Sequence, residues 1–134
     1  MKIKWLTLGL VITAIMVMVM AGCSSLPKQV SADVSSSGKQ IEIAAGGSFT
    51  ITLDSNATTG YSWELKGISD TAVLEKADNK YEAPASGLMG AGGKEVWTFE
   101  AMKAGTSTLT MEYSQPWAGG QKSANIFSLT VVVK

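Results

Sequence analysis

Few side chains of this chain could carry out catalysis. The 134 residues include no His and a single Cys, Cys23, whereas Asp and Glu together number 11. Without an imidazole, the Ser-His-Asp and Cys-His nucleophilic arrangements are excluded, and so are the common His/Cys zinc sites. We therefore expect no catalytic residue, no metal site and no cofactor. Carboxylate chemistry is the one enzymatic alternative that remains.

A carboxylate-dependent hydrolase needs two acids held at a fixed separation in a cleft. The acids of this chain fall mostly in loops or on the polar faces of predicted strands, where they are most simply solvated surface charge. They are Asp33, Glu42, Asp54, Glu64, Asp70, Glu75, Asp78, Glu82, Glu95, Glu100 and Glu112. Lys and Arg also total 11, so the formal net charge is zero and gives no reason to expect a nucleic-acid partner.

Three short loops carry residues suited to binding rather than catalysis. They span residues 56–61, 88–93 and 115–117. In the first loop, Asn56 and Gly60 favour turn conformations, and we expect the hydroxyls of Thr58 and Thr59 to point outward. The loop would then project rigidly into a partner's cleft. Alternatively, it is only a polar hairpin loop ahead of an inward-facing aromatic pair, Tyr61 and Trp63.

The second loop combines apolar and glycine residues in a way that is unusual on a surface. Its residues are Leu88, Met89, Gly90, Ala91, Gly92 and Gly93. Such a segment can offer backbone hydrogen bonds and one apolar side chain to a groove, because glycine lets two backbones approach closely. The alternative is a flexible linker whose two apolar side chains fold back into the core.

The third loop places an aromatic residue at the end of a strand. It reads Gln115, Pro116 and Trp117 and is followed by Gly119 and Gly120. A partly exposed Trp is a typical anchor in protein interfaces. Alternatively, the Trp folds over the end of the domain and covers its core.

Residues 40–134 have the period-two pattern of half-buried β-strands. Apolar and polar residues alternate around Ile41, Phe49, Trp63, Val96, Thr106 and Ile126, and residues 73–76 form another short predicted strand. Glycines separate these segments, and no window favours a helix. The pattern predicts an all-β fold, an immunoglobulin-like β-sandwich or barrel with the three loops at one end.

The N-terminal residues differ in composition from this domain. Lys2 and Lys4 precede an apolar run over residues 6–20, which predicts a signal peptide over residues 1–22. Residues 23–39 are rich in Ser, and we expect a flexible tether there. Ala21 and Gly22 directly before Cys23 resemble the lipobox of bacterial lipoproteins. An ordinary signal peptide with a chance Cys, or an uncleaved anchor, is the alternative.

The lipobox resemblance implies that Cys23 is acylated and becomes the first residue of the mature protein. The lipid bilayer is then a partner, since two or more acyl chains anchor a protein firmly. Localisation would be the bacterial cell envelope. In a cell with two membranes, Ser24 rather than Asp after the Cys favours the outer membrane. In a cell with one membrane, the protein would lie on the outer face of the plasma membrane.

Together the three loops resemble those of the chagasin family of inhibitors of papain-like cysteine proteases. The first is similar to the family's Asn-Pro-Thr-Thr-Gly motif, with Ala57 in place of Pro. The second is similar to its Gly-x-Gly-Gly element with a preceding apolar pair. The third is similar to Arg-Pro-Trp, with Gln115 in place of Arg. The resemblance covers residues 40–134.

This resemblance implies reversible, competitive inhibition by a monomer. Thr58 and Thr59 would lie beside the protease's catalytic Cys–His pair, and Met89 would enter its apolar S2 pocket. Trp117 would cover the primed side of the cleft. The alternative function is binding rather than inhibition. The chain would then be an envelope lipoprotein whose loops bind a glycan or another protein, with Tyr61 and Trp117 stacking on sugar rings.

Overall fold

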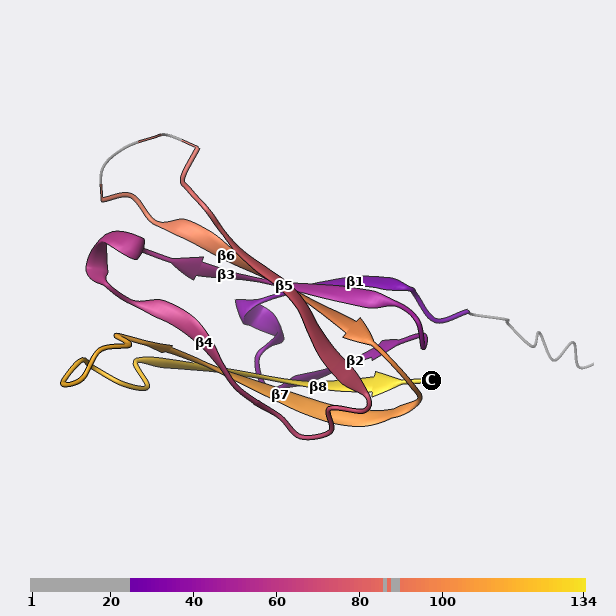
Figure 1. The fold of residues 1–134 in the computed structure, drawn as a ribbon. Helices are drawn as coiled ribbons and strands as arrows, with labels where there is room; N and C mark the ends of the chain where they lie inside the picture. Colours follow the sequence, from indigo (N-terminus) through magenta and orange to yellow (C-terminus); the bar gives the residue numbers. More distant parts are fainter. Residues whose placement is uncertain (1–24, 86, 88–89) are drawn as a thin grey trace, which may run out of the picture.

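Two four-stranded sheets packed face to face form the domain, as Figure 1 shows for the computed structural model, which describes residues 25–85, 87 and 90–134. The first sheet has the order β1 (Gln29–Asp33), β3 (Ser48–Ser55), β6 (Gly93–Ala101) and β5 (Leu74–Glu82). The second has the order β2 (Lys39–Ile43), β8 (Asn125–Val133), β7 (Gly105–Ser114) and β4 (Ser62–Ile68). Two single-turn 3-10 helices, η2 (Val34–Ser36) and η3 (Ala57–Thr59), connect strands.

The alternating apolar residues of the strands meet between the two sheets. Phe49 on β3 stacks on Phe99 on β6, with ring centroids 5.3 Å apart. The largest fully buried side chains come from both sheets: Phe49, Phe99, Phe127, Ile43, Ile51, Leu53, Leu74, Leu109, Met111, Leu129, Val73 and Val131. Because every second residue of these strands faces inward, the period-two pattern builds one continuous core. The predicted all-β, immunoglobulin-like sandwich is confirmed.

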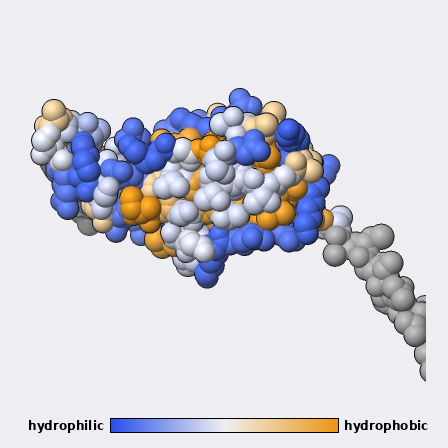
Figure 2. Space-filling view, turned by 90° about the horizontal axis from the view of Figure 1, so that it is seen from below, coloured by the Kyte–Doolittle hydropathy of each residue, from blue (hydrophilic) through white to orange (hydrophobic). Residues whose placement is uncertain are grey.

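The outer face of the second sheet is composed mainly of small polar residues. Thr108, Thr110, Ser128 and Thr130 alternate with core residues on β7 and β8, and the hydroxyls of Thr108 and Thr130 lie 3.0 Å apart. Figure 2 shows this face from below as a pale, near-neutral area interrupted by separate apolar patches. No helix among the described residues is both long and apolar enough to cross a membrane.

The segment expected to be a flexible tether is folded from Gln29 onward. β1 pairs in parallel with β3, so that Val30 lies opposite Phe49 and Ala32 opposite Ile51. The Ser-rich residues that follow form η2, which Asp33 caps by accepting a hydrogen bond from the Ser35 N–H at 2.8 Å. The apolar alternation in β1 spans only two residues, too few to be distinguished from a polar linker.

β5 is longer than the predicted strand over residues 73–76. It extends from Leu74 to Glu82, and every residue after Leu74 is exposed. Because β5 is an edge strand that pairs with β6 alone, its distal part follows its neighbour without burying side chains. A strand exposed on both faces carries no apolar periodicity, so the sequence pattern predicts only its buried beginning.

Strand register places the three loops at one end of the sandwich. Ser55, the last residue of β3, lies opposite Gly93, the first residue of β6. At the start of β4, Ser62 lies opposite Ser114, which ends β7. Figure 1 shows the connections β3–β4, β5–β6 and β7–β8 together at this end, and the start of β1 at the opposite end.

Candidate functional site

Asn56 organises the first loop through its side chain. Its Oδ1 accepts hydrogen bonds from the Thr58 N–H at 3.1 Å and from the Thr58 hydroxyl at 2.6 Å, and thereby caps η3. Gly60 ends the helix with a φ of +80°, a left-handed conformation that favours glycine. Short polar side chains are preferred at N-caps because they satisfy backbone N–H groups at a helix start. The loop is therefore a fixed turn.

The two threonines are exposed, as expected, but their hydroxyl hydrogens do not point outward. Thr58 donates to Asn56 Oδ1, and Thr59 donates to the Asn56 carbonyl oxygen at 2.7 Å. A hydroxyl has one hydrogen to donate and two lone pairs to accept with. Both side chains can therefore accept hydrogen bonds from a partner and present their methyl groups, whereas their donors hold the loop together.

The amide of Asn56 also joins the first loop to the second. Its Nδ2 donates to the Gly90 carbonyl oxygen at 3.1 Å, and Gly90 itself has a φ of +81°. Leu88 and Met89, which the sequence predicts as binding residues, lie outside the described residues. Ala91 is half-buried and Gly92 is exposed at the base of the same loop. One asparagine thus fixes two neighbouring loops.

Gly93 belongs to the sheet rather than to the predicted contact loop. It is the first residue of β6 and is buried. A Cβ atom at this position would collide with the Glu82 carbonyl oxygen and the Tyr81 side chain. The glycine is required by packing against β5, and little of its surface is exposed.

Trp117 packs against the first loop instead of covering the sandwich core. Its indole lies directly over Gly60, where any Cβ atom would collide with the ring. The side chain nevertheless remains 50% exposed. Pro116 beside it is also exposed. The first loop therefore contacts the six-membered-ring end of the indole, while half of the side chain stays open to solvent.

Two glutamines complete the connection between the first and third loops. Gln115 donates through Nε2 to the Thr59 carbonyl oxygen at 3.5 Å and accepts at Oε1 from the Gln121 N–H at 2.9 Å. The Tyr61 hydroxyl donates to the Gln121 side chain. The first loop is thereby bonded to both of its neighbours. Gln121 was not predicted, since an isolated Gln after a glycine pair has no local signature of this role.

A stack of aromatic side chains supports these loops from below. Tyr61 and Trp63 pack on Tyr113, with ring centroids 5.2 and 5.1 Å from it. Tyr61 was expected to face inward with Trp63, but it is only half-buried and lies at the rim. The Tyr113 hydroxyl accepts a hydrogen bond from the Asn56 N–H at 3.1 Å. Tyr113 thus links the core directly to the first residue of the first loop.

Glu95 is a buried carboxylate beneath the same end of the sandwich. It is 8% exposed, and its Oε2 accepts a hydrogen bond from the Trp63 N–H at 3.0 Å, which joins β6 to β4 across the two sheets. The sequence reading of the acids as solvated charge is wrong here. Glu95 shares the inward register of Trp97 and Phe99, and that alternation was a usable signal. Its role is structural, because it holds the strand that leaves the first loop.

An exposed ion pair lies on the outer face of the first sheet, on the side of β6 opposite to Glu95. Lys94 donates from Nζ to the Asp54 carboxylate at 2.7 Å. This hydrogen bond, reinforced by the charge of Asp54, raises the pKa of Lys94 above its ordinary value. Among the residues that the structure describes, no three acidic or Cys side chains come together as a set of metal ligands.

Comparison with known proteins places this geometry in a family. Residues 42–131, which include all three loops, match the model of the chagasin family peptidase inhibitor I42. Chagasin from Trypanosoma cruzi is 34% identical to this chain over 95 residues, which cover 69% of this chain and 86% of chagasin.

Solved structures share the fold. The crystal structure of the cysteine protease inhibitor EhICP2 from Entamoeba histolytica superposes with a TM-score of 0.67 at 20% identity, covering 81% of this chain and 99% of that one. PbICP-C, whose structure is of a complex with falcipain-2, superposes with a TM-score of 0.53 at 20% identity, covering 81% and 94%. At these identities the likeness concerns the fold, whereas the family match covers most of the sequence. The chain belongs to the chagasin family of peptidase inhibitors.

Proposed function

We propose that this chain is a reversible, competitive inhibitor of papain-like cysteine proteases and that its three loops together block the catalytic cleft. A member of this family inhibits peptidases and is not itself an enzyme. The observation that carries the proposal is the joining of the loops into one edge. Asn56 binds the second loop, and Gly60 and Thr59 bind the third. The inhibitor acts as a monomer that forms a one-to-one complex.

In this mechanism the first loop enters the cleft beside the protease's catalytic Cys and His. Thr58 and Thr59 present methyl groups and free acceptor lone pairs there, and they exclude both water and substrate. The chain contributes no catalytic nucleophile to this contact, so no covalent bond forms. The outward face of Trp117 covers one side of the cleft, and the second loop covers the other. The entry of Met89 into the S2 pocket stays a prediction.

Affinity depends on how little the loops must be ordered on binding. Each flexible segment that becomes fixed in a complex costs conformational entropy, and a preformed surface avoids that cost. Ala57 lacks the fixed φ of the proline in the family motif. The Asn56 cap and the bonds to Gly90 and Gln115 restrict the loop instead.

Steady-state inhibition of a papain-like protease by residues 25–134, which contain both sheets and the whole core, tests this function. We expect competitive inhibition, and Trp117→Ala should raise the inhibition constant at least about 30-fold, as for an interface hot spot. The matched control is Met102→Ala, which removes a similarly exposed apolar side chain, 47% exposed, after the far end of β6. Absence of inhibition at micromolar concentration, by a folded domain and across several such proteases, would refute the proposal.

We further propose that Cys23 is acylated and anchors the inhibitor to the cell envelope. Support comes from the sequence of residues 1–23 and from the position of β1, whose start lies at the opposite end of the sandwich from the loops. An anchor attached there leaves the inhibitory edge facing away from the membrane. Metabolic labelling with palmitate should mark the wild type but not Cys23→Ser. An unlabelled wild-type protein would exclude the anchor.

A further inference from the structure

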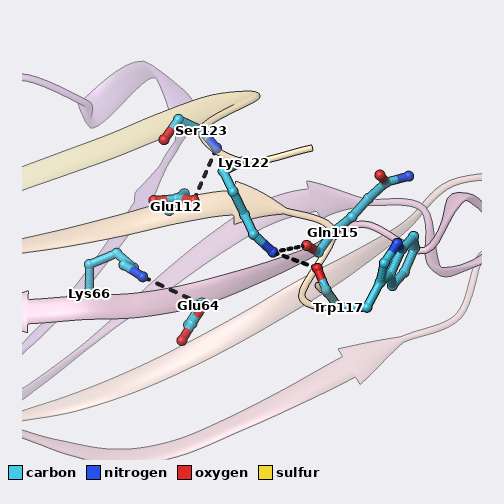
Figure 3. A network of polar contacts seen from close by, with 7 residues as sticks. All are labelled: Glu64, Lys66, Glu112, Gln115, Trp117, Lys122 and Ser123. Carbon is cyan, nitrogen blue, oxygen red and sulfur yellow. Dashed lines mark hydrogen bonds and ion pairs between the residues drawn. The ribbon is translucent and has the colours of Figure 1, made fainter. Parts of the chain in front are cut away.

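Lys122 is the charged side chain that contacts the backbone of the third loop. Its Nζ donates hydrogen bonds to the Gln115 carbonyl oxygen and, at 3.0 Å, to the Trp117 carbonyl oxygen. Figure 3 shows the lysine side chain reaching back over the loop to both oxygens. The Trp117 carbonyl also accepts from the Gly120 N–H at 3.1 Å. An ammonium group that bridges two carbonyls fixes their relative orientation, because charged hydrogen bonds are the stronger ones.

The backbone directly after Lys122 has an unusual conformation. Ser123 has a φ of +53°, and it is the one residue other than glycine with a positive φ among those described. Such a conformation is unfavourable for a residue with a Cβ and persists where surrounding contacts enforce it. The Ser123 N–H donates to the Glu112 carboxylate on β7 at 3.0 Å (Figure 3). Glu112 thus holds the residue that directly follows Lys122.

We propose that Lys122 is a positioning residue that sets the orientation of Trp117 in the inhibitory edge. Gly60 packs against the six-membered-ring end of the indole, and Lys122 holds the peptide to which the indole is attached. Gln115 brings no charge of its own to this loop, so the ammonium is the cation that stabilises its carbonyls. The inference rests on the proposed function, in which the exposed part of Trp117 contacts the protease.

Two measurements on Lys122→Met test this role. The first is acrylamide quenching of tryptophan fluorescence in the free domain, residues 25–134. It reports mainly on Trp117, since Trp63 and Trp97 are only 8% and 4% exposed. The second is the inhibition constant for a papain-like protease. We expect Lys122→Met to increase quenching and to weaken inhibition about fivefold to tenfold, which is within the range for the loss of a typical hydrogen bond. Lys122→Arg should leave both the quenching and the inhibition constant close to their wild-type values, since it keeps the charge and the donors.

The matched control is Lys66→Met on neighbouring β4, which removes an exposed lysine whose ion pair with Glu64 is 3.8 Å long. It should change neither measurement. In a Trp117→Ala background, Lys122→Met should have no further effect on inhibition. A folded Lys122→Met domain with unchanged quenching, or with unchanged inhibition where the wild type inhibits, would overturn the positioning role. If the wild type inhibits no such protease, the proposed function fails, and the quenching alone decides whether Lys122 orients Trp117.

Discussion

Both polar atoms of the Asn56 side chain form hydrogen bonds within or between the first and second loops. Its Oδ1 caps η3 and its Nδ2 binds the Gly90 carbonyl, so the acceptor serves one loop and the donor serves the other. This division of roles allows the two functions to be separated by substitution. Replacing the amide by a carboxylate keeps the acceptor and removes the donor.

Asn56→Asp should therefore preserve the first loop and release the second. The carboxylate can still accept hydrogen bonds from Thr58. Its second oxygen, however, faces the Gly90 carbonyl oxygen, and the two oxygens repel each other. We expect the free energy of binding to the protease to become less favourable by about 1 kcal/mol or more, which is the cost of a lost hydrogen bond. The melting temperature of the domain should change little. Amide chemical shifts of Thr58 and Gly90 provide the check. Unchanged shifts at Gly90, or equal affinity, would show that the connection between the loops has no role.

Gly60→Ala should displace Trp117. A Cβ atom would collide with the indole and would also meet a φ of +80°, which costs about 1–2 kcal/mol for a residue other than glycine. We expect lower stability and weaker inhibition together. Gly67→Ala on β4 is the control, because open space surrounds that position. Equal effects of the two substitutions on inhibition would contradict the packing of Trp117 on Gly60.

For individual residues, the sequence predicts those that form the loops better than those that connect one loop to another. Asn56, Gly60 and Trp117 are recognisable from local motifs. Tyr113, Gln121 and Lys122 act on partners that are distant in the chain or lie beyond a turn, as in the 57-residue separation of Asn56 and Tyr113. Such pairings depend on the strand register, which no local pattern records.

Among the elements, β1 shows how a short strand can extend a domain beyond its sequence pattern. It covers the outer edge of β3 and buries Ala32 against the core. The sequence places the domain start at residue 40, because alternation is sustained only from there. The strands of the core were predicted, whereas β1 and the distal part of β5 were not, since both bury few apolar side chains.

Removal of β1 should destabilise the sandwich. We expect residues 34–134 to lose about 2 kcal/mol or more of the free energy of unfolding relative to residues 25–134, since Val30 and Ala32 leave the core and the β3 edge is exposed. Denaturant titration followed by circular dichroism measures this difference. Val34→Ser is the control, because that side chain is 64% exposed in the adjoining η2. Equal stability of the two lengths would mean that β1 contributes nothing to the fold.

For the molecule as a whole, the two ends of the sandwich differ in what they carry. The loops gather at one end, and the chain enters β1 from the other. Binding at the loop end is therefore compatible with the proposed attachment of the N-terminal segment to a membrane. Met102 lies after the far end of β6, away from the loops, and for this reason Met102→Ala should leave inhibition unchanged.

The most direct measurement is the rate at which iodoacetamide alkylates the catalytic Cys of a papain-like protease in the presence of saturating residues 25–134. If the loop edge fills the cleft, alkylation should slow to the rate at which the complex dissociates, and it should recover on dilution. Trp117→Ala at the same concentration should protect less. Alkylation at the rate of the free protease, in a complex shown by gel filtration to be intact, would contradict occlusion of the cleft.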